Sequence, residues 1–426
     1  MRVAIPCREF TLDNGLRLIV HEDGTAPIVS VNVWYRVGSR DEQPGRTGLA
    51  HLFEHLMFEG SANVPPGEFD RRLEQAGAIN NGSTTPDRTN YWETLPANAV
   101  ELALFLEADR MGGLLDTLSH DRFDAQRDVV MNERLENYEN RPYGLAHERI
   151  LGALYPPGHP YHWPVIGFMT DIAAATFDDA VAFCRRFYNP TNASIAVAGD
   201  VDTDDVVRLA DRWFGGIPRG TAPDRAAASA LELADDVRIV MPDAVRLPRL
   251  YMAWHSPPAF ADGDAAMDAL GSVLAAGKAS RLYDSLVRTG RAVDVSSYQH
   301  GSQLGSSFEI VVTTRPESDL DAIEETVRDA IDAIARDGIT TDEHLRVRNG
   351  IMTAFVDELQ TVGGFGGRAD RLNLYAMHMG QPDSVQADLD RYLRLRPGHV
   401  RVAAARFLAN AHPVSLHVVP RANGDS

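Results

Sequence analysis

The residues most able to do chemistry lie in one short segment, 48–60. Two histidines, His51 and His55, are four residues apart, and Glu54 comes directly before the second. Because residues four apart lie on one face of a helix, the two imidazoles can bind a single metal ion. Glu54 lies on the flank of that face and can act as a general base on water without ligating the metal. This H-x-x-E-H order is a signature of metal-dependent peptidases, the inverse of H-E-x-x-H.

The motif alone is weak evidence, because a chain with 14 histidines contains it by chance in roughly a few per cent of cases. The alternative interpretation is a surface helix with two ordinary histidines. Six apolar residues around the motif argue against it, since they predict a largely buried helix whose polar groups need partners. A metal ion would be one such partner. The six residues are Leu49, Leu52, Phe53, Leu56, Met57 and Phe58.

A third metal ligand must come from another part of the chain. Catalytic zinc usually has three protein ligands and a water. The candidate segment is 126–139, in which an apolar run precedes Glu133, and Glu136 and Glu139 follow it. Spacing alone does not choose among these three glutamates.

The surrounding sequence predicts the elements that must position these residues. Residues 8–37 are typical of strands, with an Asn-Gly turn at Asn14 and Gly15 between two alternating runs. The H-x-x-E-H helix, 48–58, follows them. The next predicted elements are helix 67–76, strands 79–83 and 89–95, and helices 99–115 and 120–137.

The second half of the chain repeats this order. A segment rich in Ala, Asp, Pro and Gly, residues 221–236, predicts a linker. The elements predicted after it are strands 237–240 and 249–255, helix 265–274, strand 306–314, and helices 320–336 and 342–359.

One local alignment supports an internal duplication. Three residues of helix 120–137 match three of helix 342–359 at a constant offset, and Ala354 falls where Glu133 falls. The alternative is a chance likeness of two amphipathic helices. We predict an α+β fold of two duplicated domains, each a mostly antiparallel sheet packed with helices. The domains are a catalytic one at 1–220 and a degenerate repeat without zinc ligands at 237–426. The matched pairs are Asp121 with Asp342, Arg127 with Arg348, and Met131 with Met352.

Length and composition fit this interpretation. The chain has 426 residues, 44% of them apolar and 24% charged, which is typical of a globular protein of about two domains. Its net charge of −19 argues against binding to nucleic acid or an anionic membrane by electrostatics. No run of about 18 apolar residues predicts a transmembrane helix.

Location is predicted from the cysteines and the N-terminus. Cys7 and Cys184 do not form a disulfide framework, which fits a reducing compartment. Pro6, Arg8 and Glu9 interrupt the N-terminus before the apolar core of a signal peptide can form. We therefore predict a cytoplasmic protein, or a periplasmic one if a signal peptide has been removed.

Several segments together resemble the pitrilysin/insulinase (M16) metallopeptidases, in the bacterial and mitochondrial-processing-peptidase-like branch. The resemblance implies a LuxS/MPP-like metallohydrolase fold and one Zn²⁺ per chain, held by His51, His55 and Glu133, with Glu54 as the base. The context "V-V-x-x-E" thus selects Glu133 from the three glutamates. The matching segments are 48–61, 127–133, 139–144, 159–161, 166–167, 187–192 and 197–200.

The resemblance also implies a substrate-binding edge strand of pattern N-A-x-T. Here it is Asn81-Gly82-Ser83-Thr84, with glycine in place of alanine. An edge strand has unpaired backbone groups to which an extended peptide can add. The alternative for 80–82 is a simple turn.

Two positions depart from the family pattern. Many members carry a second glutamate where this chain has Gln126, which can form hydrogen bonds but cannot act as a base. We expect Gln126 and Glu136 to support the ligands. The family's substrate-binding arginine and tyrosine fall on Val287 and Asp294, although Arg288 and Tyr298 lie close by.

The missing pair predicts a partner subunit that carries it; the alternatives are a shifted alignment or a homodimer. The predicted function is zinc-dependent endopeptidase activity on peptides or flexible, unfolded segments, as the catalytic subunit of a dimer. Two alternatives are a non-catalytic scaffold or binding subunit, and a dedicated maturation protease for one precursor.

Overall fold

The computed structural model describes residues 2–225 and 231–421, and its contacts divide the chain into two compact units. The units interleave along the sequence, whereas the sequence predicts a single division at the 221–236 linker. Residues 226–230 of that linker lie outside the described part. Unit 1 comprises Met1–Arg134, Trp163–Ala226 and Phe355–Ala387, and unit 2 comprises Leu135–His162, Ala227–Ala354 and Asp388–Ser426.

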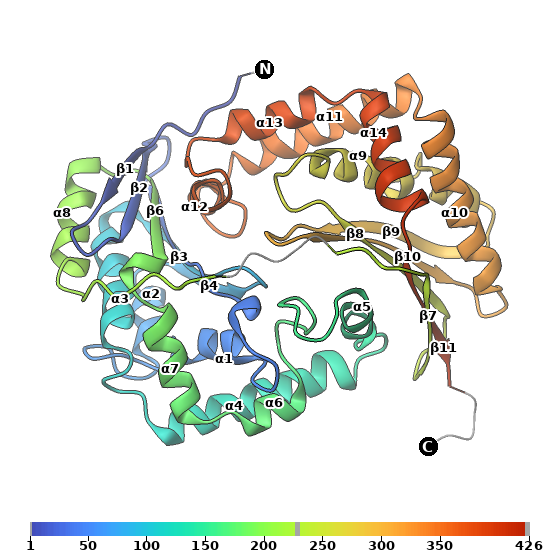
Figure 1. The fold of residues 1–426 in the computed structure, drawn as a ribbon. Coiled ribbons are helices and arrows are strands. Elements are labelled where there is room, and N and C mark those ends of the chain that lie inside the picture. Colours follow the sequence, from blue (N-terminus) through green and yellow to red (C-terminus); the bar gives the residue numbers. More distant parts are fainter. Residues whose placement is uncertain (1, 226–230, 422–426) are drawn as a thin grey trace. The chain divides into compact units, whose positions relative to one another are not determined.

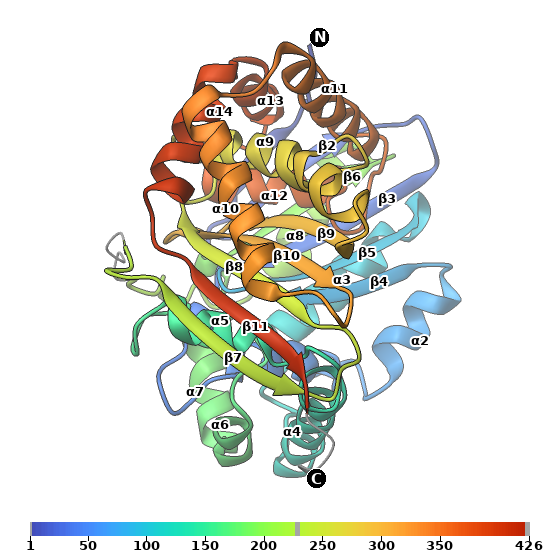
Figure 2. The same cartoon turned by 90° about the vertical axis from the view of Figure 1, so that its right-hand side faces the viewer.

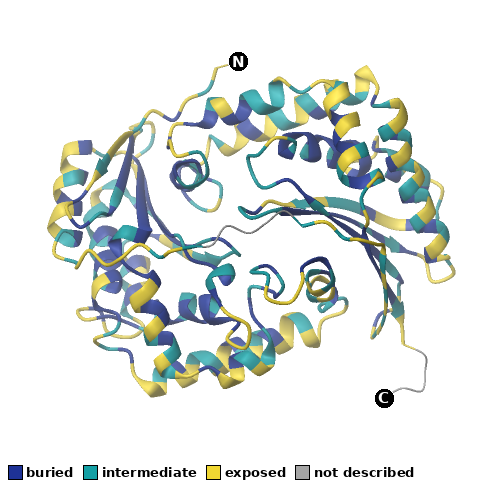
Figure 3. Cartoon of the chain, in the orientation of Figure 1, coloured by how far each residue is buried: buried dark blue, intermediate teal, exposed yellow. Residues whose placement is uncertain are grey.

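Unit 1 contains a six-stranded sheet in the order β1-β2-β6-β3-β5-β4. The pair β2–β6 is parallel and the other pairs are antiparallel. Figure 3 shows the central strands as buried, as their Val- and Ile-rich sequences predict. The bounds are β1 Arg8–Thr11, β2 Arg17–Glu22, β3 Ile28–Tyr35, β4 Ile79–Thr84, β5 Thr89–Pro96 and β6 Ala193–Gly199.

Helices cover both faces of the unit 1 sheet (Figure 1). On one face Tyr35 of β3 meets Tyr188, which contacts Phe53 of α1. On the other face Asn32 and Trp34, also of β3, reach Asp370 of α12. Successive side chains of a strand point to opposite faces, so β3 contacts both helix layers. The helices are α1 Leu49–Leu56, α2 Glu68–Gln75, α3 Val100–Gly113, α4 His120–Arg134, α6 Met169–Ala174, α7 Phe177–Phe187, α8 Thr203–Phe214 and α12 Arg368–His378.

Unit 2 contains a five-stranded sheet in the order β7-β11-β8-β10-β9 (Figure 2). Its only parallel pair among the described strands is β7–β11. Numbered within each half, β2 to β6 and β7 to β11 have the same order, 1-5-2-4-3, with the parallel pair in the same place. The predicted duplicated α+β fold is therefore confirmed. The bounds are β7 Val237–Asp243, β8 Arg249–Ser256, β9 Ala292–His300, β10 Ser306–Thr314 and β11 Val414–Pro420.

One helix from each half of the chain packs in the unit formed mainly by the other half. Helix α5, Ala146–Leu154, follows α4 and packs on β8 and β11 of unit 2. Helix α12 follows α11, the helix matched to α4, and packs on β3 and β6 of unit 1. Each half of the chain thus contributes one helix, from the same place in its element order, to the other unit. The remaining helices are α9 Asp264–Ala275, α10 Leu320–Asp337, α11 Thr341–Glu358, α13 Val385–Leu393 and α14 Pro397–Ala403.

Candidate metal centre

Helix α1, which carries the H-x-x-E-H motif, begins at a defined point. Gly48 has a φ of 89°, and a Cβ there would lie 2.6 Å from the carbonyl oxygen of Ile166. The buried carboxylate of Glu42 accepts hydrogen bonds from the backbone N–H groups of Gly48 (2.9 Å) and Ala50 (2.8 Å). It thereby satisfies two free donors at the helix start, although burial raises the pKa of Glu42 to about 8.

The structure brings three side chains of the predicted metal site together in unit 1. The Oε2 atom of Glu133, on α4, lies 3.8 Å from Nε2 of His51 and 3.5 Å from Nε2 of His55. One ligand atom from each residue lies within 4.8 Å of the other two. Ligands around a tetrahedral zinc ion at about 2.1 Å are separated by about 3.4 Å. This His₂Glu donor set and its spacing therefore fit zinc.

The protonation of the two imidazoles is set by burial and by Glu133. Burial lowers the pKa of His51 to about 4, so this imidazole is neutral and can donate a lone pair. For His55, burial acts to lower the pKa, but the hydrogen bond and charge of Glu133 outweigh it and the pKa is raised. The hydrogen bond with His55 in turn lowers the pKa of Glu133.

Glu54 belongs to α1, and its side chain contacts strand β4. Burial raises its pKa above the usual value for glutamate. The hydroxyl of Thr84 opposes this effect by donating a 2.5 Å hydrogen bond to Oε2 of Glu54. A buried carboxylate with a raised pKa is suited to taking and returning a proton near neutral pH.

Strand β4 is the edge of its sheet and runs through residues 79–84, so the alternative of a turn at 80–82 is wrong. It pairs with β5 along one side. Gly82 lies against the motif, because a Cβ there would come 3.3 Å from Oε1 of Glu54 and 3.1 Å from the ring of Tyr91. Arg88 donates to the carbonyl of Ser83 (2.9 Å) and to Asn90 (2.8 Å), which braces the end of the strand. In the same segment, Asn81 accepts a hydrogen bond from the N–H of Gly82.

The two predicted supporting residues have different surroundings. Gln126 donates a 2.6 Å hydrogen bond to Glu59, and its side chain acts to raise the pKa of His55. A residue in this place can support a metal ligand, as outer residues of metal sites do. Glu136 is exposed in a π-helical turn, Leu135–Glu139, that is grouped with unit 2. Glu42 and Glu59 did not come from the sequence reasoning, since neither belongs to a recognisable ligand pattern.

In unit 2, Val287 and Asp294 stand where the family pattern has its substrate-binding arginine and tyrosine. Val287 packs against the apolar core, and Asp294 lies on β9. Arg288 forms an ion pair with Asp284, while Tyr298 is 51% exposed on β9.

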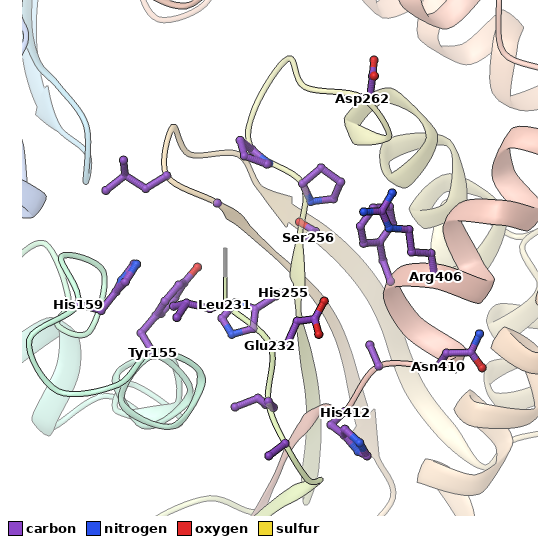
Figure 4. Close-up of a pocket in the computed structure, with 18 of the residues that line it drawn as sticks. Tyr155, His159, Leu231, Glu232, His255, Ser256, Asp262, Arg406, Asn410 and His412 are labelled. Atoms are coloured by element: carbon purple, nitrogen blue, oxygen red, sulfur yellow. The ribbon is translucent and has the colours of Figure 1, made fainter. Parts of the chain in front are cut away.

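A separate cavity of about 700 Å³ lies within unit 2 (Figure 4). Tyr155, His159 and His255 line one side of it, and Arg406 and His412 line another. None of the candidate zinc ligands borders it, so this cavity is distinct from the metal centre. Among the described residues, no helix is both long and apolar enough to span a membrane.

The fold and the motif helix define a duplicated α+β protein with a His₂Glu cluster in its first half. The family model for insulinase (peptidase family M16) matches residues 17–158, and the model for the M16 inactive domain matches residues 174–351. The chain belongs to peptidase family M16, which confirms the resemblance seen in the sequence.

Two named relatives and a solved structure agree with this family assignment. The zinc protease PqqE of Helicobacter pylori is 31% identical over 380 residues, covering 88% of this chain and 83% of that protein. An uncharacterized zinc protease of Streptomyces coelicolor is 27% identical, covering 96% of this chain and 89% of that protein. A crystal structure of a protease from Helicobacter pylori matches with a TM-score of 0.88 and 27% identity, covering 97% of this chain and 100% of that one.

Proposed function

We propose that this protein is a zinc-dependent endopeptidase. The single observation that carries the proposal is the meeting of His51, His55 and Glu133 around a space the size of one ion, beside the partly buried carboxylate of Glu54. The names of the relatives, which are zinc proteases, support the same metal.

Each side chain has a distinct role in the proposed mechanism. His51, His55 and Glu133 would hold the metal, which when bound supplies Lewis acidity at the scissile carbonyl and activates water. Glu54 takes a proton from the attacking water and passes it to the leaving amine. Gln126, held by its hydrogen bond to Glu59, would help to position His55.

The proposed substrate is an extended peptide. Strand β4 is at the sheet edge; Asn81 is exposed there, and Gly82, Ser83 and Thr84 are half-buried. A peptide added to this edge would be bound through its backbone with little demand on side-chain identity. Flexible or unfolded segments meet this requirement, because a folded strand has its backbone groups already paired. A processing protease for one precursor would bind in the same way.

The two halves would differ in role. We assign catalysis to a domain at 1–220, joined by the 221–236 linker to a repeat at 237–426 that lacks the ligand set. The match of residues 174–351 to the M16 inactive domain supports a non-catalytic repeat, although it begins within 1–220, and Ala354 occupies the position that corresponds to Glu133. Because Val287 and Asp294 replace the arginine and tyrosine, the working form would be a dimer with an M16-like subunit that carries the pair, or a homodimer.

The test is the substitution Glu54→Gln, which keeps the size of the side chain and removes the base. Hydrolysis of a fluorogenic peptide should fall by at least about 100-fold, with the zinc content equal to that of the wild-type protein. Glu74→Gln, at an exposed glutamate of α2, is the matched control and should keep full activity. Full activity in Glu54→Gln would refute the mechanism, and a wild-type protein without zinc or peptidase activity would favour the scaffold alternative.

A further inference from the structure

Unit 2 contains a second cluster with the same donor types as the candidate catalytic centre. It consists of His147 on α5, His300 at the end of β9 and Glu309 on β10. One ligand atom from each of the three residues lies within 4.8 Å of the other two. All three belong to unit 2, so this cluster is defined within one compact unit.

Sheet register explains why two of these side chains meet. Glu309 pairs with Tyr298 across β10 and β9, and His300 is two residues beyond Tyr298. Residues two apart on a strand point to the same face, so Glu309 and His300 share one face of the sheet. Ala253, which pairs with Glu309 on the other side, packs with Ala146 of α5. Helix α5 therefore lies over this face and carries His147 to the pair.

The carboxylate of Glu309 is buried, so its charge needs partners that offset the free-energy cost of burial. The residue is 6% exposed, while the side chains of His147 and His300 are 45% and 46% exposed. Its two oxygens lie 3.9 Å from Nδ1 of His147 and 3.7 Å from Nε2 of His300. A buried carboxylate needs a cationic or hydrogen-bonding partner, and a metal ion shared with the two imidazoles is one such partner.

A comparison with a third cluster shows what sets this one apart. Asp321, Glu324 and His417 also come within 4.8 Å of one another. In that cluster arginines already neutralise both carboxylates, since Arg328 lies 2.7 Å from Glu324 and Arg238 lies 2.6 Å from Asp321.

In the described part of the chain, by contrast, the ion-pair partners of Glu309 are the two histidines. A divalent cation held by the three side chains would compensate the charge of the buried carboxylate.

We propose that His147, His300 and Glu309 form a second metal site, which takes Zn²⁺ or another borderline divalent ion such as Co²⁺. Two imidazoles and one carboxylate suit these ions rather than Ca²⁺ or Mg²⁺, which prefer oxygen ligands. The histidine nitrogens lie 3.9 and 3.7 Å from Oε1 and Oε2 of Glu309, whereas in the catalytic candidate they lie 3.8 and 3.5 Å from the single oxygen Oε2 of Glu133. The bound ion would join α5 to the β9–β10 edge.

The experiment measures zinc in untagged full-length protein after stripping with chelator, reloading and washing. Wild-type protein should bind about two zinc ions per chain, and His300→Ala should bind about one. In the His51→Ala/His55→Ala background, about one should remain, and adding His300→Ala should remove it. Adding His344→Ala, a histidine of α11 outside the three clusters, should leave it in place.

Thermal unfolding supplies a second measurement that does not depend on catalysis. Zinc should raise the Tm of the His51→Ala/His55→Ala protein by several degrees and leave that of the His300→Ala derivative unchanged. Equal Tm values for the stripped proteins would show that the variants fold. Zinc that is absent from the His51→Ala/His55→Ala protein, or that stays after His300→Ala is added, would overturn the proposal. An ion pair between Glu309 and protonated histidines would then account for the cluster. If zinc were lost only from the site of His51, His55 and Glu133, the measurement on the second cluster would still stand.

Discussion

The hydroxyl of Thr84 donates a 2.5 Å hydrogen bond to the carboxylate of Glu54. This contact joins the edge strand β4 to helix α1, which carry the proposed peptide-binding segment and the proposed base. Burial raises the pKa of Glu54, and the hydrogen bond limits the rise by stabilising the ionised form. The state of the base therefore depends on a residue of the strand to which the substrate would add.

Substituting Thr84 by valine should raise the pKa of Glu54 further, because the ionised carboxylate loses a donor. Since the base must be ionised, the acidic limb of the kcat/KM profile should move to higher pH, with about a 10-fold loss at a pH on that limb. Thr84→Ser, which keeps the hydroxyl, is the control. Superimposable pH profiles for the valine and serine variants would contradict the role of the hydrogen bond.

Glu42 should control both the stability of α1 and the affinity of the metal site. Glu42→Ala leaves the N–H groups of Gly48 and Ala50 without an acceptor. We expect the free energy of unfolding to fall by about 2 kcal/mol, because a buried cap is lost. Zinc affinity, measured by competition with a chelator, should fall by about 10-fold as the ligand helix loosens. Glu74→Ala, at an exposed position of α2, should change neither quantity, and an unaltered affinity in Glu42→Ala would exclude the positioning role.

Asp370 should be essential for the packing of α12 on unit 1. Its carboxylate accepts hydrogen bonds from Trp34 (2.8 Å), Asn90 (3.2 Å) and the N–H of Gly366 (2.9 Å). Asp370→Ala leaves these largely buried donors unpaired, so the free energy of unfolding should fall by about 2–4 kcal/mol in urea titrations. Asp337→Ala, which removes an exposed ion pair with Arg336, is the control and should behave as wild type. Equal midpoints for the two variants would argue against the prediction.

Asp268 should make the stability of unit 2 depend on pH. Burial raises its pKa to about 6, and the hydroxyl of Tyr392 donates a 2.7 Å hydrogen bond to it. An aspartate in the unfolded chain titrates near about 3.9, so the folded state holds this proton more tightly. The contribution of Asp268 is therefore greatest below pH 4 and is lost as the pH rises to about 6.

Asp268→Asn removes this titration. Between pH 4 and pH 7 the variant should gain about 2–3 kcal/mol of unfolding free energy relative to wild type, as measured by urea titration at each pH. Asp332→Asn, at an exposed site of α10, should follow the wild-type curve. A constant difference between Asp268→Asn and wild type across this range would show that Asp268 is not the titrating group.

Local pattern was sufficient for many elements of the fold. The alternation in residues 8–37 and the Asn14-Gly15 turn predicted β1, β2 and β3, and helical spacing placed His51, Glu54 and His55 together on α1. Repeated element order indicated the duplication, which the common strand order confirms. These features depend on contacts between residues close in sequence, so a single chain reveals them.

Only the tertiary structure decided which distant residues meet. Spacing left Glu133 as one of three glutamates until the family resemblance selected it, and no local pattern indicated that Glu42 caps α1 or that α5 and α12 exchange units. The cluster of His147, His300 and Glu309 likewise spans a helix and two strands. The physical reason is that periodicity records which face of an element is buried, whereas packing and sheet register determine what that face is buried against.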